Sequence, residues 1–453
     1  MSSVKLLTAA LLTVASVAVA APYEPNWSSL DRRETPAWWV DAKFGIFVHW
    51  GPYCVPAYAP TDEGSVYECY AEWYQGKMLQ GREKFLSHHA KTYGGAPYAN
   101  FAAEFKAENF DPAAWANLFK RAGAKYTVLT SKHHDGYALW PSPESPYYNA
   151  VVLGSGRDLA GEFTVAMKAA GLKSGFYYSL MEYANPLYTN GNRQAWSRAV
   201  NLPQMKELVE NYHADIVWTD GEWDAPDAEW LSVEFLAWLY NESSMRESVV
   251  VNDRWGKGCR GVHGGHYTTE YGNVDGDKTV EDFAVHPFEE CRGIGRSFGY
   301  NRYETPANYM TRAQCVETLV KTVAAGGNLL LNVGPTADGR IPAIMQDRLL
   351  AIGDWLKVNG EAIYASRRAR VKASEPRVYV TAKGDSFYAI DFRLDGKPFT
   401  IEGVKDVASV SLVGSFAKVG HEVRDGVLVV TPPALSPATS PCEHAWTYCI
   451  RTK

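Results

Sequence analysis

The chain has 453 residues, of which 46% are hydrophobic and 21% are charged. This length and apolar content suit one large and one smaller domain, and they exclude a disordered or low-complexity protein. Lysine and arginine number 45 against 51 aspartates and glutamates, and the net charge of −6 excludes the basic surface that nucleic acid requires.

The first 20 residues predict a secretory signal peptide. Lys5 supplies the positive charge, residues 6–19 are apolar, and Ala18-Val19-Ala20 fits the small-x-small rule for cleavage. The apolar run is shorter than the roughly 20 residues of a membrane span, and no second such run follows. We therefore expect an exported protein without a membrane anchor, either secreted or periplasmic, with a lysosomal destination left open.

Short apolar runs alternate with amphipathic helical patterns up to residue 364. The runs are almost continuously apolar, as expected of parallel strands that are buried on both faces. Strands are predicted at residues 43–51, 125–132, 173–180, 215–220, 248–253 and 328–333. Helices are predicted at residues 111–123, 158–172, 203–213 and 344–358, and in a segment that ends at Gly326-Gly327.

This alternation is compatible with an open doubly wound sheet or with a (β/α)8 barrel. The first predicted strand ends in His49-Trp50-Gly51-Pro52, without the G-x-G-x-x-G of a dinucleotide-binding sheet. Polar residues instead follow the strand ends, where barrel active sites lie: His49, His133, His134, Asp220 and Arg254. We therefore predict an α/β fold with a (β/α)8-like TIM barrel over residues 21–366.

The pattern changes after the predicted barrel. Residues 367–453 contain short β-type runs, separated by turn-rich stretches of glycine, proline and aspartate. This texture predicts a small C-terminal antiparallel β-sandwich. It contains no cluster of catalytic residue types, so we expect it to have a packing or accessory-binding role.

Asp220 ends an apolar strand, and its carboxylate is therefore expected at the barrel mouth. Glycoside hydrolysis needs two carboxylates on opposite sides of the scissile bond. Glu270 is the candidate second carboxylate, with Glu289 and Glu290 as rivals, whereas Glu222 follows Asp220 so closely that it fits the loop better. A strand-end aspartate taken alone is equally compatible with a structural cap.

Histidine and arginine side chains allow a metal site or a sugar site. His49, His133, Asp220 and Glu270 are a possible ligand set, but the spacings H-x-H and H-E-x-x-H do not occur. We therefore predict no metal and no cofactor, and neutral imidazoles that hydrogen-bond sugar hydroxyls. Arg254 is expected to bind a hydroxylated ligand or the nucleophile, with an ion pair to a neighbouring carboxylate as the alternative.

The aromatic content favours a sugar ligand. Aromatic residues make up 13% of the chain, including 15 tryptophans, and there is no basic excess to accompany stacking on bases. Glu72-Trp73 supplies a polar group beside a flat ring on the first long loop.

Seven blocks of the sequence, in order within residues 27–366, resemble the α-L-fucosidases of glycoside hydrolase family 29. They are residues 38–51, 70–74, 124–136, 251–256, 297–301, 326–335 and 360–364. The resemblance implies a barrel followed by a β-sandwich, and hydrolytic removal of terminal α-L-fucose with retention of configuration. The expected partners are fucosylated oligosaccharides or glycoconjugates, with no nucleic acid and no membrane.

The resemblance also implies roles for individual residues. Asp220 matches the nucleophile, and Glu270 matches the acid/base, with Glu289 as the alternative. Phe298 and Trp73 would pack against the methyl group and apolar face of fucose. The residues that match the fucose pocket are His49, Glu72, Trp73, His133, His134, Tyr177, Trp218, Arg254 and Phe298.

The mechanism implied is a double displacement, in which Asp220 attacks while Glu270 protonates the departing oxygen. Retaining carboxyl pairs lie about 5–5.5 Å apart and inverting pairs about 6.5–9.5 Å apart. Two alternatives from other classes are a carbohydrate-binding protein that keeps the pocket without turnover, and a metal-dependent barrel hydrolase that uses the histidines.

Overall fold

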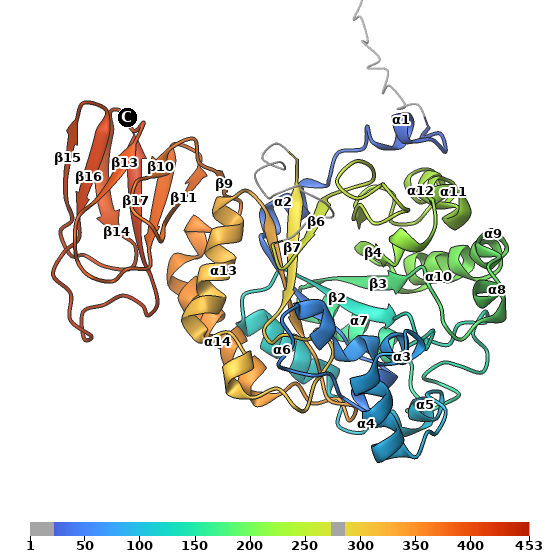
Figure 1. Cartoon of the computed structure of the whole chain (residues 1–453). Coiled ribbons are helices and arrows are strands. Elements are labelled where there is room, and N and C mark those ends of the chain that lie inside the picture. Colours follow the sequence, from blue (N-terminus) through green and yellow to red (C-terminus); the bar gives the residue numbers. More distant parts are fainter. Residues whose placement is uncertain (1–21, 273–285, 453) are drawn as a thin grey trace, which may run out of the picture.

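The computed structural model describes residues 22–272 and 286–452 of the chain. The predicted signal peptide lies outside these residues. An eight-stranded parallel sheet forms the centre of the larger part, and a β-sandwich stands beside it in Figure 1. Within the described ranges, no helix is long and apolar enough to cross a lipid bilayer.

The parallel sheet is the predicted TIM-like barrel. Its strand order is β5-β4-β3-β2-β1-β8-β7-β6, so the two edge strands are consecutive in the chain. Backbone hydrogen bonds link this edge, from Gly265 N to Asn252 O at 2.9 Å and from His266 N to Val251 O at 3.1 Å. The strands are β1 (Phe44–Val48), β2 (Tyr126–Lys132), β3 (Lys173–Ser179), β4 (Ile216–Asp220), β5 (Val250–Val251), β6 (Tyr267–Glu270), β7 (Phe288–Gly293) and β8 (Asn328–Val333).

Alternation along each strand sorts the side chains into two layers. Phe47, Tyr177 and Trp218 belong to a buried cluster inside the barrel. Ile46 and Tyr178, one position away on the same strands, pack in the outer core under the helices. Because successive side chains of a strand point to opposite faces, every second residue near a strand end faces the barrel mouth.

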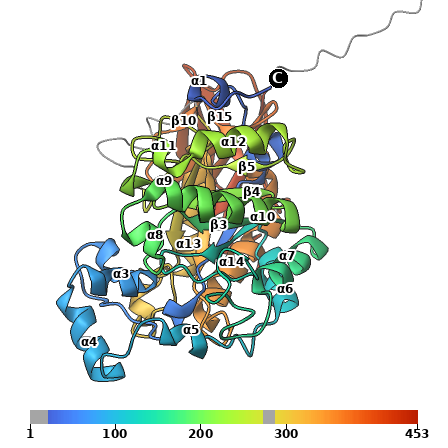
Figure 2. The same ribbon diagram turned by 90° about the vertical axis from the view of Figure 1, so that its right-hand side faces the viewer.

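Helices cover the outside of the sheet. Of the longer ones, α6, α7, α10, α13 and α14 lie where the sequence predicts them, whereas α4 and α12 were not predicted. Asp111 caps α6 by accepting a hydrogen bond from Ala114 N at 2.9 Å, and Gly123 follows the helix with a φ of 88°. Figure 2 shows α10 and α12 on the outer side of β3–β5. The longer helices are α4 (Glu83–Tyr93), α6 (Pro112–Arg121), α7 (Leu159–Ala169), α10 (Leu202–Tyr212), α12 (Ser232–Asn241), α13 (Arg312–Ala324) and α14 (Ala343–Asn359).

Shorter helices lie mainly in the connections. α3 continues the first long loop, which carries Glu72 and Trp73 toward the barrel mouth. The shorter helices are α1 (Trp27–Leu30), α2 (Ala37–Ala42), α3 (Tyr74–Leu79), α5 (Asn100–Glu104), α8 (Pro186–Thr189), α9 (Arg193–Trp196) and α11 (Asp227–Trp230).

The C-terminal strands form two antiparallel sheets, as predicted. One has the order β10-β13-β16-β15, and the other β14-β17-β12-β11-β9. The strands are β9 (Arg367–Arg368), β10 (Lys372–Ala373), β11 (Val378–Lys383), β12 (Ser386–Asp391), β13 (Phe399–Glu402), β14 (Val407–Leu412), β15 (Gly420–Arg424), β16 (Val427–Thr431) and β17 (Trp446–Thr452). The division of the chain at residue 366 stays a prediction.

The sandwich packs against α13 and α14 (Figure 1). Trp355 on α14 donates its indole N–H to Ala445 O at 3.1 Å. Glu317 on α13 pairs with Arg377, with 2.8 Å between Oε2 and Nη2. This contact is on the outside of the helices. The sandwich therefore contributes none of its described residues to the wall of the barrel mouth, which is formed by the loops after β1–β7.

Candidate active site

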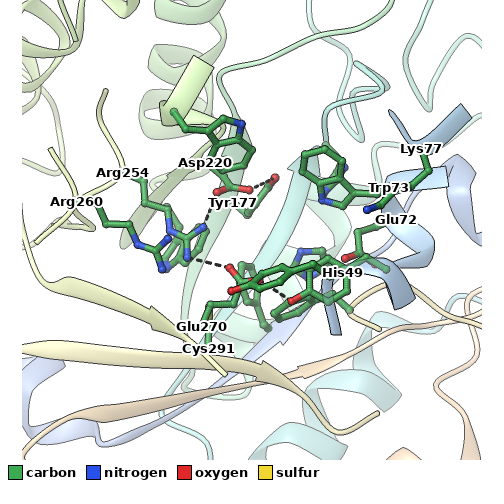
Figure 3. Close-up of a pocket in the computed structure, with 17 residues that line it drawn as sticks. His49, Glu72, Trp73, Lys77, Tyr177, Asp220, Arg254, Arg260, Glu270 and Cys291 are labelled. Atoms are coloured by element: carbon green, nitrogen blue, oxygen red, sulfur yellow. Dashed lines mark hydrogen bonds and ion pairs between the residues drawn. The ribbon is translucent and has the colours of Figure 1, made fainter. Parts of the chain in front are cut away.

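A cavity of about 320 Å³ opens at the carboxyl ends of the barrel strands. Asp220 ends β4, and Arg254 follows β5 by three residues. Glu270 ends β6, and Trp73 comes from the first long loop. Figure 3 shows Arg254 and Arg260 on one side of the cavity and Trp73 and Lys77 on the opposite side.

Arg254 joins the two candidate catalytic carboxylates. Its Nη1 donates to Asp220 Oδ1 at 2.6 Å, and its Nη2 donates to Glu270 Oε2 at 3.2 Å (Figure 3). Its Nε donates to Thr268 Oγ1 at 3.1 Å, and its guanidinium carbon lies 4.5 Å from the centre of the Trp218 ring. The forked guanidinium of Arg254 is therefore held by contacts on several sides, and it fixes the two carboxylates relative to each other.

Asp220 is kept in its ionised form. Tyr177 donates its hydroxyl to Asp220 Oδ2 at 2.8 Å, opposite the contact with Arg254. Burial would raise the pKa of the Asp220 carboxyl, but the charge of Arg254 and the hydrogen bonds from Arg254 and Tyr177 hold it below its ordinary value of 3.8. A carboxylate in this state is suited to nucleophilic attack at neutral pH.

Glu270 and Glu289 lie at different depths of the barrel. Adjacent strands β6 and β7 pair Thr268 with Glu289 and Glu270 with Cys291. Glu289 is thus two residues, or about 6.6 Å, nearer the strand beginnings than Glu270. Glu270 lines the cavity, whereas Glu289 lies beneath it with 1% of its side chain exposed.

Each of the two glutamates has its own set of donors. Tyr70 donates its hydroxyl to Glu270 Oε1 at 2.7 Å, from the loop after β1. Glu289 accepts from Tyr126 at 2.5 Å and from the Trp218 indole at 2.9 Å. Both oxygens of Glu289 are thereby occupied inside the barrel. The rival Glu290 accepts from Thr269 and from Gly272 N, and it is not on the cavity wall.

The three predicted site histidines, His49, His133 and His134, are buried and neutral. His49 Nδ1 lies 2.7 Å from Asn332 Oδ1, and the Asn332 amide nitrogen donates to Phe298 O at 2.6 Å. The oxygen of the Asn332 amide therefore accepts from His49 Nδ1–H, which leaves His49 Nε2 as an acceptor. Burial lowers the pKa of His49 to about 3 and that of His134 to about 4, and it lowers the pKa of His133 well below 6.5.

His134 lies beside Asp220 and against the wall residues Trp73 and Trp223, although it is not itself on the cavity wall. Its Nδ1 lies 2.6 Å from Ser179 Oγ, whose own proton goes to Met181 O at 2.8 Å. His134 Nε2 is therefore an unprotonated acceptor, 3.8 Å from Asp220 Oδ2, with no hydrogen-bond partner in the described structure. A ligand hydroxyl placed between these two acceptors can donate to one of them. Across the described ranges, no three His, Cys, Asp or Glu side chains are grouped as metal ligands would be.

Glu72 is the buried polar group of the first loop. It accepts hydrogen bonds from Gly299 N at 2.8 Å and Ser297 Oγ at 3.2 Å, so it ties this loop to the segment that carries Phe298. Burial raises the pKa of Glu72 to about 7, against the effect of these hydrogen bonds. The Trp73 ring contacts His134 edge-on, with the ring centres 4.8 Å apart.

The structure brings most of the predicted site residues to one cavity wall. His134 and the alternative Glu289 are outside that wall. The predicted residues on it are His49, Glu72, Trp73, His133, Tyr177, Trp218, Asp220, Arg254, Glu270 and Phe298. The other wall residues were not among the predicted site residues, and they are Phe47, Tyr67, Tyr70, Lys77, Trp223, Arg260 and Cys291.

Two of the missed residues had a usable signal. Phe47 precedes His49 by two positions on a strand, so period-two alternation places them on the same face. Tyr70 lies two positions before Glu72 in the same loop motif. For Cys291 the pairing of β6 and β7 was needed, because β7 was not predicted as a strand.

Glu222 is a buried carboxyl next to the cavity. Its side chain is in the loop after Asp220, as predicted, but the residue is only 2% exposed. Neither carboxyl oxygen has a hydrogen-bond partner among the described residues. Burial, together with the charge of Asp220, raises the pKa of Glu222 to about 8, although Arg254 and Arg260 oppose this. Glu222 is therefore largely protonated at neutral pH.

Comparison with known proteins assigns this barrel to a family. A family model described as α-L-fucosidase matches residues 10–361. The chain belongs to the α-L-fucosidase family. It is thus an enzyme of the glycoside hydrolase class, and the predicted family and enzyme class are confirmed.

Individual relatives extend over nearly the whole fucosidase chain. The tissue α-L-fucosidase of Bos taurus is 41% identical over 442 residues, which cover 94% of this chain and 90% of the bovine protein. The Thermotoga maritima α-fucosidase in complex with a mechanism-based inhibitor has a TM-score of 0.81 at 33% identity, covering 95% of this chain and 100% of that chain. The same enzyme in complex with fucose has a TM-score of 0.79 at 33% identity, covering 94% and 100%.

Proposed function

We propose that this fucosidase removes terminal α-L-fucose with retention of configuration, through a covalent fucosyl-enzyme. The observation that carries the proposal is the fork of Arg254, which donates to Asp220 and to Glu270 at the wall of one cavity. Two carboxylates held at one sugar site, one of them kept ionised, are the parts that a double displacement needs.

In the first step, Asp220 attacks the anomeric carbon and the bond to the glycosidic oxygen breaks. Glu270, protonated, gives its proton to that oxygen, so the aglycone leaves as a neutral alcohol. Arg254 and Tyr177 orient Asp220, and Tyr70 orients Glu270. The step leaves fucose bonded to Asp220 through an ester, with Glu270 ionised.

In the second step, Glu270 takes a proton from water as the water attacks the anomeric carbon. The ester bond to Asp220 breaks, its electron pair returns to the carboxylate, and α-L-fucose is released with Glu270 protonated again. Two inversions at the same carbon give net retention.

Side chains around the two carboxylates supply the fucose site. We propose that the acceptors His49 Nε2 and His134 Nε2 receive sugar hydroxyl protons, and that Glu72 binds a further hydroxyl. Trp73 and Phe298 offer apolar surface for the methyl-bearing face of the sugar. His133, Tyr177 and Trp218 complete the site. The Thermotoga maritima relative bound to fucose supports this choice of sugar.

The natural partners we propose are fucosylated oligosaccharides or glycoconjugates outside the cytoplasm. Export rests on the predicted signal peptide in residues 1–20. The curated relatives include a tissue enzyme of Bos taurus and a plasma enzyme of Rattus norvegicus. Secretion, periplasmic export and lysosomal delivery are all compatible with such a leader.

The test follows the first anomer released from an aryl α-L-fucoside by NMR. We expect α-L-fucose before mutarotation produces the β-anomer. Initial β-fucose would overturn the nucleophile role of Asp220. Azide then separates the two carboxylates: Asp220→Gly should form β-fucosyl azide in one inversion, and Glu270→Ala should form α-fucosyl azide from the fucosyl-enzyme. The reverse pattern would exchange the two roles.

A further inference from the structure

Two aromatic rings on the cavity wall are exposed to solvent. Trp223 is 40% exposed and Tyr67 is 44% exposed, whereas Tyr177, Trp218 and Phe298 are at most 5% exposed. The buried rings form the interior of the sugar site. Trp223 and Tyr67 therefore mark the mouth, where the remainder of a glycan leaves the cavity.

The loop after Asp220 fixes the position of Trp223. Gly221 turns the chain with a φ of 83°, and a single 3-10 turn, η5 (Glu222–Asp224), follows. Trp230 donates its indole N–H to Glu222 O at 3.3 Å, which anchors this turn. Trp223 is thus held three residues from the proposed nucleophile.

Neighbouring rings fix the orientation of the Trp223 indole. It stacks on Trp73, with ring centres 6.1 Å apart and planes at 21°. It also meets His134 edge-on, with centres 5.9 Å apart and planes at 86°. A side chain already ordered by such contacts loses little conformational entropy when it binds a ligand. Tyr67, on the loop after β1, has an edge contact with Tyr70 at 5.5 Å.

We propose that Trp223 is the platform for the sugar ring that carries the fucose. This inference rests on the proposed function, because it places the leaving group next to the fucose site. A pyranose ring has apolar C–H faces and a polar rim, and a braced, half-exposed indole offers a flat apolar surface to such a face. The preferred substrate class is therefore a fucosylated oligosaccharide whose second ring stacks on Trp223, rather than a fucoside with a small leaving group.

The experiment compares two substrates that share the fucosyl group and differ in the leaving group. α-L-Fucosyl fluoride has no second ring, and a fucosyl-galactose disaccharide has one. For Trp223→Ala we expect the ratio of kcat/KM for the disaccharide to kcat/KM for the fluoride to fall about tenfold. Trp223→Phe keeps a flat ring and should recover most of the ratio. Tyr147→Ala removes a ring that is 87% exposed and outside the cavity wall, and it serves as the matched control.

Three results would overturn the platform. In Trp223→Ala, an unchanged kcat/KM on both substrates shows that the second ring does not use this indole. If the ratio falls in Tyr67→Ala and not in Trp223→Ala, the second sugar ring stacks on Tyr67. An equal loss on both substrates places Trp223 in the fucose site itself. If the parent enzyme releases fucose from neither substrate, the proposed function fails and the platform fails with it. If the parent enzyme releases fucose from both substrates, the variants test the role of Trp223 separately from the proposed function.

Discussion

Glu289 accepts a hydrogen bond from the indole of Trp218 at the floor of the cavity, with 2.9 Å between Oε2 and Nε1. The Trp218 ring in turn lies 4.5 Å from the guanidinium carbon of Arg254. Arg254 donates to Asp220 and Glu270. Glu289 thus contacts the candidate catalytic pair only through other side chains, and we expect it to position Trp218.

Glu270→Gln and Glu289→Gln should differ in how they depend on the leaving group. Loss of the acid in Glu270→Gln should reduce kcat about 10²–10⁴-fold on fucosides with poor leaving groups and much less on activated aryl fucosides. Glu289→Gln should reduce kcat about tenfold on both, because a buried hydrogen bond is weakened without loss of a proton donor. Kinetics on the two substrate classes, with and without azide, measure this. If azide restores the activity of Glu289→Gln, Glu289 and not Glu270 is the acid/base.

Arg254→Lys should move the acid limb of the pH–rate profile. Arg254 holds the pKa of Asp220 below 3.8 against the effect of burial. A lysine cannot span both carboxylates, so the pKa of Asp220 should rise and the nucleophile should become protonated at higher pH. The acid limb of kcat/KM is then expected to shift upward in pH, with an overall loss of about 100-fold.

Arg377→Lys is the matched control for that shift. Arg377 also forms a forked pair, with Glu317 at 2.8 and 2.9 Å, but at the contact with the sandwich. The acid limb of the pH–rate profile of Arg377→Lys should coincide with that of the parent enzyme. If Arg254→Lys keeps the parent acid limb as well, Arg254 does not control the ionisation of Asp220.

Glu222→Gln should flatten the decline of stability with rising pH. The folded carboxyl keeps its proton up to about pH 8, whereas the unfolded one loses it near 4.5. Between these values the folded state binds more protons, so the free energy of unfolding falls as pH rises. The contribution is at most about 1.4 kcal/mol per pH unit, and it disappears in the amide variant.

Urea unfolding across this pH window measures the slope for the parent and for Glu222→Gln. Glu247→Gln is the control, since that side chain is 88% exposed. Parallel curves for the parent and Glu222→Gln would show that Glu222 is not protonated in the folded enzyme.

Lys132→Met should destabilise the barrel strongly. Lys132 Nζ lies 2.9 Å from Glu182 Oε2, and the two side chains are 0% and 6% exposed. Removal of the cation leaves a buried carboxylate unpaired, which costs about 3–5 kcal/mol. Chemical denaturation should show this loss, and little change for Lys357→Met, whose pair with Asp354 is solvent-exposed. Equal effects at the two sites would contradict the argument.

The sequence determined the strands that are built around a run of apolar residues. β1 to β4 and β8 lie within the predicted segments because continuous apolar runs are stable only where helices cover one face and the barrel interior the other. The same pattern placed His49, Asp220 and Arg254 at strand ends. β6 and β7 were missed because Thr268, Glu270 and Glu289 interrupt the apolar pattern. Their polar side chains are satisfied inside the barrel, by partners distant in sequence.

Only the tertiary structure places the two candidate glutamates at different depths of the barrel. In the sequence both follow Asp220, the candidate nucleophile, at comparable distances, and either could supply the second carboxylate. The pairing of Thr268 with Glu289 sets Glu289 deeper than Glu270. A shift of two residues along a strand moves a side chain by about 6.6 Å on the same face, so strand register, which the sequence does not reveal, separates the cavity wall from the floor beneath it.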